Sequence, residues 1–128
     1  MPAAEKLGIL LLSGGHERAH YAFVLAAGAA ALGREVTLFA ANDGCRALLA
    51  DLAALAGDPR DVAARAAGVA GIAELRDAAV ELGVRLIACE AGLHMAGRTA
   101  EPLLAGVEVA GVATFLAAVE GGGQIVSL

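Results

Sequence analysis

Basic and aromatic residues are scarce in this sequence of 128 residues, which has 9 Lys and Arg against 14 Asp and Glu and contains only 3% aromatic residues. The formal net charge at pH 7 is −5. Proteins that bind nucleic acids use clustered cations for the phosphates and aromatic rings on which bases stack. Because the sequence offers neither, nucleic acid is not expected to be a partner.

Cysteine is also scarce, since Cys45 and Cys89 are the only two. Two cysteines cannot build the disulfide framework of a small secreted domain. The first six residues lack the basic stretch and cleavage pattern of a secretory signal. Arg34 and Glu35 interrupt the one candidate membrane span, which needs about 18 apolar residues. We therefore expect a soluble, cytoplasmic protein with no membrane partner.

Apolar residues, by contrast, are abundant at 59%, while charged residues make up only 18%. A chain of this length is typical of one domain, so residues 1–128 are predicted to share a single core. The apolar content exceeds what a small globule hides easily. We expect the excess to be buried in a sheet packed between helices and in a homo-oligomer interface.

Short apolar runs alternate with segments of helical periodicity along the chain. The runs are typical of strands buried on both faces and the other segments of amphipathic helices. The expected strands are residues 7–12, 36–40, 84–88, 107–109 and 124–128. The expected helices are residues 17–32, 45–55, 72–82, 92–95 and 111–120. Residues 58–71 are expected to form a loop or a short irregular helix. This alternation predicts an α/β fold with a parallel sheet and helices on both faces.

Polar clusters follow the first three predicted strands, at residues 13–20, 42–45 and 89–94. The carboxyl ends of parallel strands share one edge of a sheet, where ligands of such folds bind. We therefore expect a pocket there. Its candidate lining residues, besides Cys89, are Ser13, His16, His20, Asn42, Cys45, Glu90 and His94.

The first cluster contains the pattern His16-Glu17-x-x-His20, which in zinc peptidases places two histidine ligands on one helical face beside a general base. Here the pattern opens a helix directly after a Gly-Gly turn, and the chain is short for a peptidase cleft. We expect a helix-start role and no zinc peptidase activity. No metal is predicted, and a metal site at these histidines that is unrelated to peptidase activity is the alternative.

The turn Ser13-Gly14-Gly15 between a strand and a helix presents backbone N–H groups that favour a small anion. It lacks the complete G-x-G-x-x-G pattern and the Lys-Ser/Thr of a P-loop. No nucleotide or other cofactor is therefore expected.

Cys89 is placed at a strand end and before a short helix, so its sulfur is expected near the mouth of the pocket and a helix N-terminus. The helix dipole and a protonated His94 would favour the thiolate, whereas the charge of Glu90 opposes it. Cys45 is either a second thiol within reach or a packing residue. Cys89 itself is either a reactive thiol or a small buried apolar side chain.

Three stretches together resemble the DsrE/DsrF-like family: residues 17–39 with a helix, Gly33 and the second strand, residues 82–97 around Cys89, and residues 106–116 with a strand and the next helix. The resemblance implies a three-layer α/β/α domain with a five-stranded parallel sheet that assembles as a homo-oligomer. It also implies that Cys89 carries sulfur as a persulfide between donor and acceptor proteins.

Two functions follow as hypotheses. The first is a sulfurtransferase-like carrier in which Cys89 accepts sulfane sulfur and passes it on. The second is a non-enzymatic, oligomeric module of the same fold that binds a small ligand or a metal, with Cys89 only lining its pocket.

Overall fold

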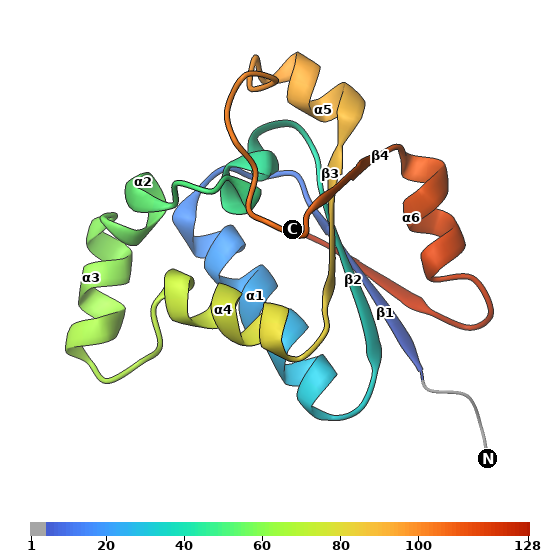
Figure 1. Ribbon diagram of the computed structural model, residues 1–128. Coiled ribbons are helices and arrows are strands. Elements are labelled where there is room, and N and C mark those ends of the chain that lie inside the picture. Colours follow the sequence, from blue (N-terminus) through green and yellow to red (C-terminus); the bar gives the residue numbers. More distant parts are fainter. Residues whose placement is uncertain (1–4) are drawn as a thin grey trace.

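The computed structural model describes residues 5–128, which form a five-stranded sheet between helices (Figure 1). The strands are β1 (Lys6–Leu11), β2 (Glu35–Ala40), β3 (Arg85–Cys89), β4 (Glu108–Ala110) and β5 (Gln124–Ser127). The helices are α1 (His16–Ala31), the 3₁₀ helix η1 (Asn42–Leu48), α2 (Ala53–Ala56), α3 (Pro59–Ala66), α4 (Ile72–Glu81), α5 (Glu90–Met95) and α6 (Val112–Ala118). No helix within residues 5–128 is long and apolar enough to cross a membrane.

All four strand pairings are parallel, and the strand order is β4-β3-β2-β1-β5. The three central strands carry the continuous apolar runs of the sequence, and Ile9, Leu38 and Ile87 on them are completely buried. Such runs suit strands that are covered on both faces. The structure therefore confirms the predicted α/β fold with five parallel strands.

The two faces of the sheet have separate apolar cores. On one face, α1 packs against α4 and against β1 and β2, whereas α6 covers the other face (Figure 1). Phe115 of α6 stacks on Phe39 of β2 with ring centroids 5.0 Å apart. Gly8 of β1 permits this close approach, because a Cβ atom there would lie 2.7 Å from Cγ1 of Val119 and 2.9 Å from Cζ of Phe115.

The prediction of one continuous helix over residues 45–55 is wrong. The Ala/Leu-rich stretch forms η1 and, after a break, the single turn of α2. Long-range hydrogen bonds hold the break open: Ala50 N–H donates to the Pro102 carbonyl at 2.9 Å, and Leu104 N–H to the Leu48 carbonyl at 2.9 Å. The buried Arg76 of α4 adds bonds from Nη1 to the carbonyls of Ala47 (3.0 Å) and Leu49 (2.6 Å). These tertiary contacts override the local helix propensity.

Residues 58–71, expected to be a loop or a short irregular helix, contain the regular helix α3. Asp58 is its N-cap and accepts the N–H of Arg60 at 2.9 Å, while Pro59 occupies the first turn. Both features favour a helix start. On the same helix, the buried Asp61 accepts hydrogen bonds from Nε2 of His16 at 2.7 Å and from the N–H of Ile72 at 2.8 Å. One carboxylate therefore ties α3 to the starts of α1 and α4.

Candidate functional site at the carboxyl edge of the sheet

The connections that follow β1, β2 and β3 lie together at the carboxyl edge of the sheet. Gly44 N–H donates to the Leu12 carbonyl at 3.1 Å, and Nη1 of Arg46 donates to the Gly14 carbonyl at 2.8 Å. Gly92 of α5 packs so closely on Ala41 and Asn42 that a Cβ atom there would overlap their backbone. The parallel topology thus brings the first residues of the three predicted polar clusters to one edge.

Cys89 is the last residue of β3 and the N-cap of α5. Its sulfur accepts a hydrogen bond from Gly92 N–H at 3.3 Å, and the side chain is half-buried. It packs against the core on the α6 face, beside Ile87 and Ala110. A backbone donor and a helix start both favour negative charge on sulfur. The position therefore combines access from solvent with a backbone N–H that points at the sulfur.

Cys45 has the opposite environment. It is completely buried in the core on the α1 and α4 face, and its sulfur donates to the Ala40 carbonyl at 3.4 Å. Burial, with a smaller contribution from Cys89, raises the pKa of Cys45 to about 11. The two sulfurs thus belong to cores on opposite faces of the sheet. Cys45 is therefore buried, and Cys89 lies near enough to contribute to its raised pKa.

Glu90 and His94 are both exposed on α5 and line a cavity of about 260 Å³. Leu93, Arg98 and Val109 also line it. The side chains of Glu90 and His94 have no hydrogen-bond partner within residues 5–128. They are therefore free to meet a molecule that approaches α5.

The two histidines of α1 contact the segment around α3 and do not line the cavity beside α5. Their ring centroids are 5.3 Å apart, but His16 bonds to Asp61, and Nε2 of His20 lies 2.9 Å from the Ala70 carbonyl. His16 lines a small cavity of about 180 Å³ together with Ser13, away from the one that His94 lines. Among residues 5–128, no three His, Cys, Asp or Glu side chains are grouped so that they could hold a metal ion. The H-E-x-x-H pattern here supports helix packing.

The model of the DsrE/DsrF-like family matches residues 5–128. The chain belongs to this family. The match covers the whole sheet and includes residues 82–97 around Cys89.

Among solved structures, this DsrE/DsrF-like chain is similar to the YchN protein of E. coli, with a TM-score of 0.70 and 16% sequence identity. The likeness covers 97% of this chain and 99% of YchN. At 16% sequence identity, the likeness to YchN shows that the two proteins share a fold. No curated protein matches the sequence.

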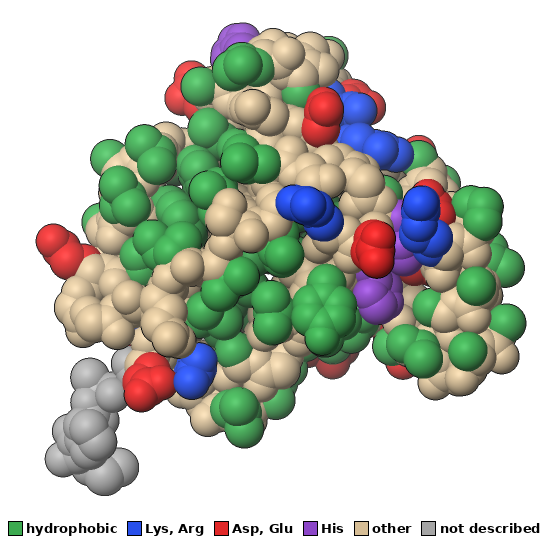
Figure 2. Space-filling view, turned by 180° about the vertical axis from the view of Figure 1, so that it is seen from behind, with side chains coloured by type: hydrophobic (Ala, Val, Ile, Leu, Met, Phe, Trp, Pro, Cys, Tyr) green, Lys and Arg blue, Asp and Glu red, His purple; other side chains and the backbone are tan. Residues whose placement is uncertain are grey.

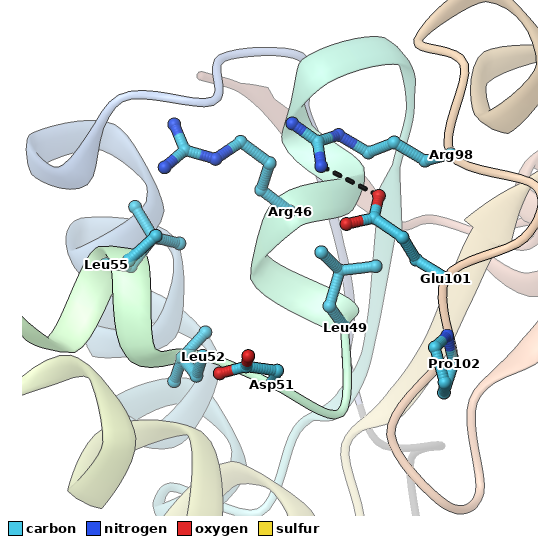
Figure 3. A pocket seen from close by; sticks show the side chains of 9 residues that line it. Arg46, Leu49, Asp51, Leu52, Leu55, Arg98, Glu101 and Pro102 are labelled. Atoms are coloured by element: carbon cyan, nitrogen blue, oxygen red, sulfur yellow. Dashed lines mark hydrogen bonds and ion pairs between the residues drawn. The ribbon is translucent and has the colours of Figure 1, made fainter.

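A further cavity of this DsrE/DsrF-like domain, of about 400 Å³, lies between η1, α2 and the connection from α5 to β4 (Figure 3). Arg46, Arg98 and Glu101 form its polar wall, and Arg98 and Glu101 also line the cavity beside α5. None of these three residues is predicted from the sequence as part of a site. Arg46 lies within the predicted helix 45–55 and Arg98 between the predicted helix 92–95 and strand 107–109. No sequence pattern indicates that β-bridging between Leu49 and Leu103 brings the two arginines together.

Proposed function

We propose that this protein is a sulfur carrier in which Cys89 holds sulfane sulfur as a persulfide. In the loading step, the Cys89 thiolate attacks the outer sulfur of a donor persulfide, R–S–SH. A bond forms between Cys89 and that sulfur, the donor S–S bond breaks, and the donor leaves as R–S⁻. In the unloading step, an acceptor thiolate attacks the outer sulfur of Cys89–S–SH, which regenerates the Cys89 thiolate.

The observation that carries this proposal is the contrast between the two thiols. Cys89 is half-buried and receives the Gly92 N–H, whereas Cys45 is buried and its pKa is raised to about 11. Nucleophilic attack requires a thiolate that a donor can reach. Membership of the DsrE/DsrF-like family, which is generally linked to sulfur relay, supports the same reaction.

Intact-mass measurement tests the proposal. Purified protein is incubated with inorganic polysulfide and desalted, and we expect a mass increase of one sulfur atom that dithiothreitol reverses. Cys89→Ser should abolish the increase, while the matched variant Cys45→Ser should retain it. Loading that persists in Cys89→Ser and disappears in Cys45→Ser would assign the wrong cysteine, and no loading of either protein would exclude the carrier function.

We further propose that the protein assembles with copies of itself through the outer surface of α6 and β5. Val112, Leu116 and Ile125 on this surface, the α6 patch, are 56%, 51% and 47% exposed. Figure 2 shows hydrophobic side chains gathered on the side of the molecule that carries α6. A single helix of seven residues covers this face, so a second copy would shield apolar surface that the chain itself leaves in water.

A further inference from the structure

The walls of the cavity between η1 and the α5–β4 connection are held in place by the backbone. Ala50 N–H donates to the Pro102 carbonyl and Leu104 N–H to the Leu48 carbonyl, both at 2.9 Å. Arg76 of α4 holds the same wall by donating from Nη1 to the Leu49 carbonyl at 2.6 Å. A cavity of about 400 Å³ with fixed walls falls within the size range of small-molecule sites.

Two guanidinium groups extend across one side of this cavity (Figure 3). Arg98 is paired with Glu101 at 2.8 Å, but its Nε is buried and has no acceptor within the described residues. Arg46 bonds through Nη1 to the Gly14 carbonyl, and it forms no ion pair with any carboxylate of residues 5–128. Since a guanidinium is always protonated, Arg46 places an uncompensated positive charge on the wall.

The remaining surface of the cavity is apolar except at one point. Leu49, Leu52 and Leu55 line it beside the arginines, as Figure 3 shows. Asp51 lies at the opposite end from the two guanidinium groups, and its Oδ1 accepts the N–H of Ala53 at 2.9 Å. The cavity therefore has positively charged guanidinium groups at one end, the negatively charged Asp51 at the other end, and an apolar surface between them.

We propose that this cavity binds a small organic monoanion with an apolar body, such as an aliphatic monocarboxylate. The anionic group accepts hydrogen bonds from the guanidinium of Arg46 and lies beside that of Arg98, and the aliphatic body lies along the leucine side of the cavity. A second negative group at the far end of the ligand would meet Asp51, so dianions of the same length are rejected.

This site is separate from Cys89. The leucines of the cavity belong to the core on the α1 and α4 face, whereas Cys89 packs on the α6 face. Cys89 does not line the cavity. The proposal of a ligand site there therefore does not rest on the proposed sulfur chemistry of Cys89.

Amide chemical-shift titration of ¹⁵N-labelled full-length protein tests the proposal with four probes. We expect hexanoate to shift the amides of Arg46 and Ala54 in a saturable way. Acetate lacks the apolar body, 1-hexanol lacks the charge, and adipate carries a second carboxylate towards Asp51. Each of these three should bind at least about tenfold more weakly than hexanoate, the effect of losing one charge-assisted hydrogen bond or a few buried methylene groups.

Four variants complete the test. Arg46→Gln should weaken hexanoate binding about tenfold, while Arg46→Lys, which keeps the charge, should restore part of it. Ala54→Phe fills the cavity from an exposed position and should abolish binding without disturbing the core. Arg60→Gln is the matched control, because it removes a positive charge from an exposed side chain outside the cavity and should leave the affinity unchanged.

The outcomes are distinct from those of the sulfur-loading experiment. Cys89→Ser should bind hexanoate like the unmodified protein, and Arg46→Gln should still take up sulfur at Cys89. Equal binding of hexanoate and 1-hexanol, or unchanged hexanoate binding in both Arg46→Gln and Ala54→Phe, would overturn the proposal. Heteronuclear spectra of the variants without ligand show whether each one is folded.

Discussion

Two cysteines of one chain differ here because of the residues that surround them. Cys45 lies in the 3₁₀ helix η1 and points into a core that leaves it no exposed surface, so its charged form loses hydration. Cys89 ends β3 where the backbone turns into α5, and the freed N–H of Gly92 reaches its sulfur. A Cys89→Ser substitution at the strand end would therefore remove the proposed reactive sulfur while changing only a half-buried side chain at the margin of the core.

Competitive alkylation measures this difference directly. In folded protein near neutral pH, iodoacetamide should modify Cys89 more than about tenfold faster than Cys45, as read per cysteine by peptide mass. Labelling of Cys45 should rise only as the pH approaches its pKa of about 11. In denaturant both thiols should react alike, which controls for peptide detection. Equal, slow labelling of both cysteines in the folded protein would argue against the carrier function and in favour of a binding module.

At the scale of elements, three helices depend on one carboxylate. Asp61 of α3 is 1% exposed and accepts bonds from His16 at the start of α1, from Ile72 N–H at the start of α4, and from Arg65 at 3.1 Å. Burial alone would raise the pKa of Asp61, but the hydrogen bonds from His16, Ile72 and Arg65 outweigh it, and the pKa lies below its usual value. The ionised carboxylate is therefore the form that holds these helices together.

Asp61→Asn should destabilise the fold by about 3 kcal/mol near neutral pH, because it removes the charge and disrupts the buried network. The stabilisation by Asp61 is fully present above the unfolded pKa of about 3.9 and is lost as the pH falls through the lower folded pKa. The difference between variant and unmodified protein in urea unfolding should therefore shrink in acid. Asp77→Asn, on the exposed side of α4, is the control and should change little. Equal urea midpoints for Asp61→Asn and the unmodified protein at neutral pH would show that the carboxylate does not stabilise the fold.

The elements that the sequence predicts well are those whose local pattern and tertiary environment agree. The strands around Ile9, Leu38 and Ile87 are apolar runs, and the sheet buries them on both faces. Residues 45–55 look helical by composition, but pairing with residues 102–104 breaks the helix. In residues 58–71 the helix-start signal of Asp58 and Pro59 was present in the sequence and was outweighed by weak apolar periodicity.

At the scale of the whole molecule, parallel topology places strand ends together, but it does not decide which side chains share a cavity. The position of Cys89 follows from the sequence because it depends on one strand and the turn after it. The separation of His16 from His94 does not, because it depends on the partner Asp61, which lies 45 residues away from His16 in sequence. Arg46 and Arg98 could not be predicted as neighbours for the same reason, since η1 and the α5–β4 connection meet only in the folded chain.

The assembly of whole molecules gives the last prediction. Two copies related by closed symmetry would cover the α6 patch, and a stable interface of this kind buries about 800 Å² on each partner. Leu116→Glu places a charge in the middle of that surface and should shift the protein to smaller species in sedimentation velocity at micromolar concentration. Val80→Glu makes a similar change at a residue 45% exposed on α4, in the other helical layer, and should leave the assembly intact. A monomeric unmodified protein would remove the proposed role of the α6 patch, and dissociation by Val80→Glu alone would move the interface to the α4 layer.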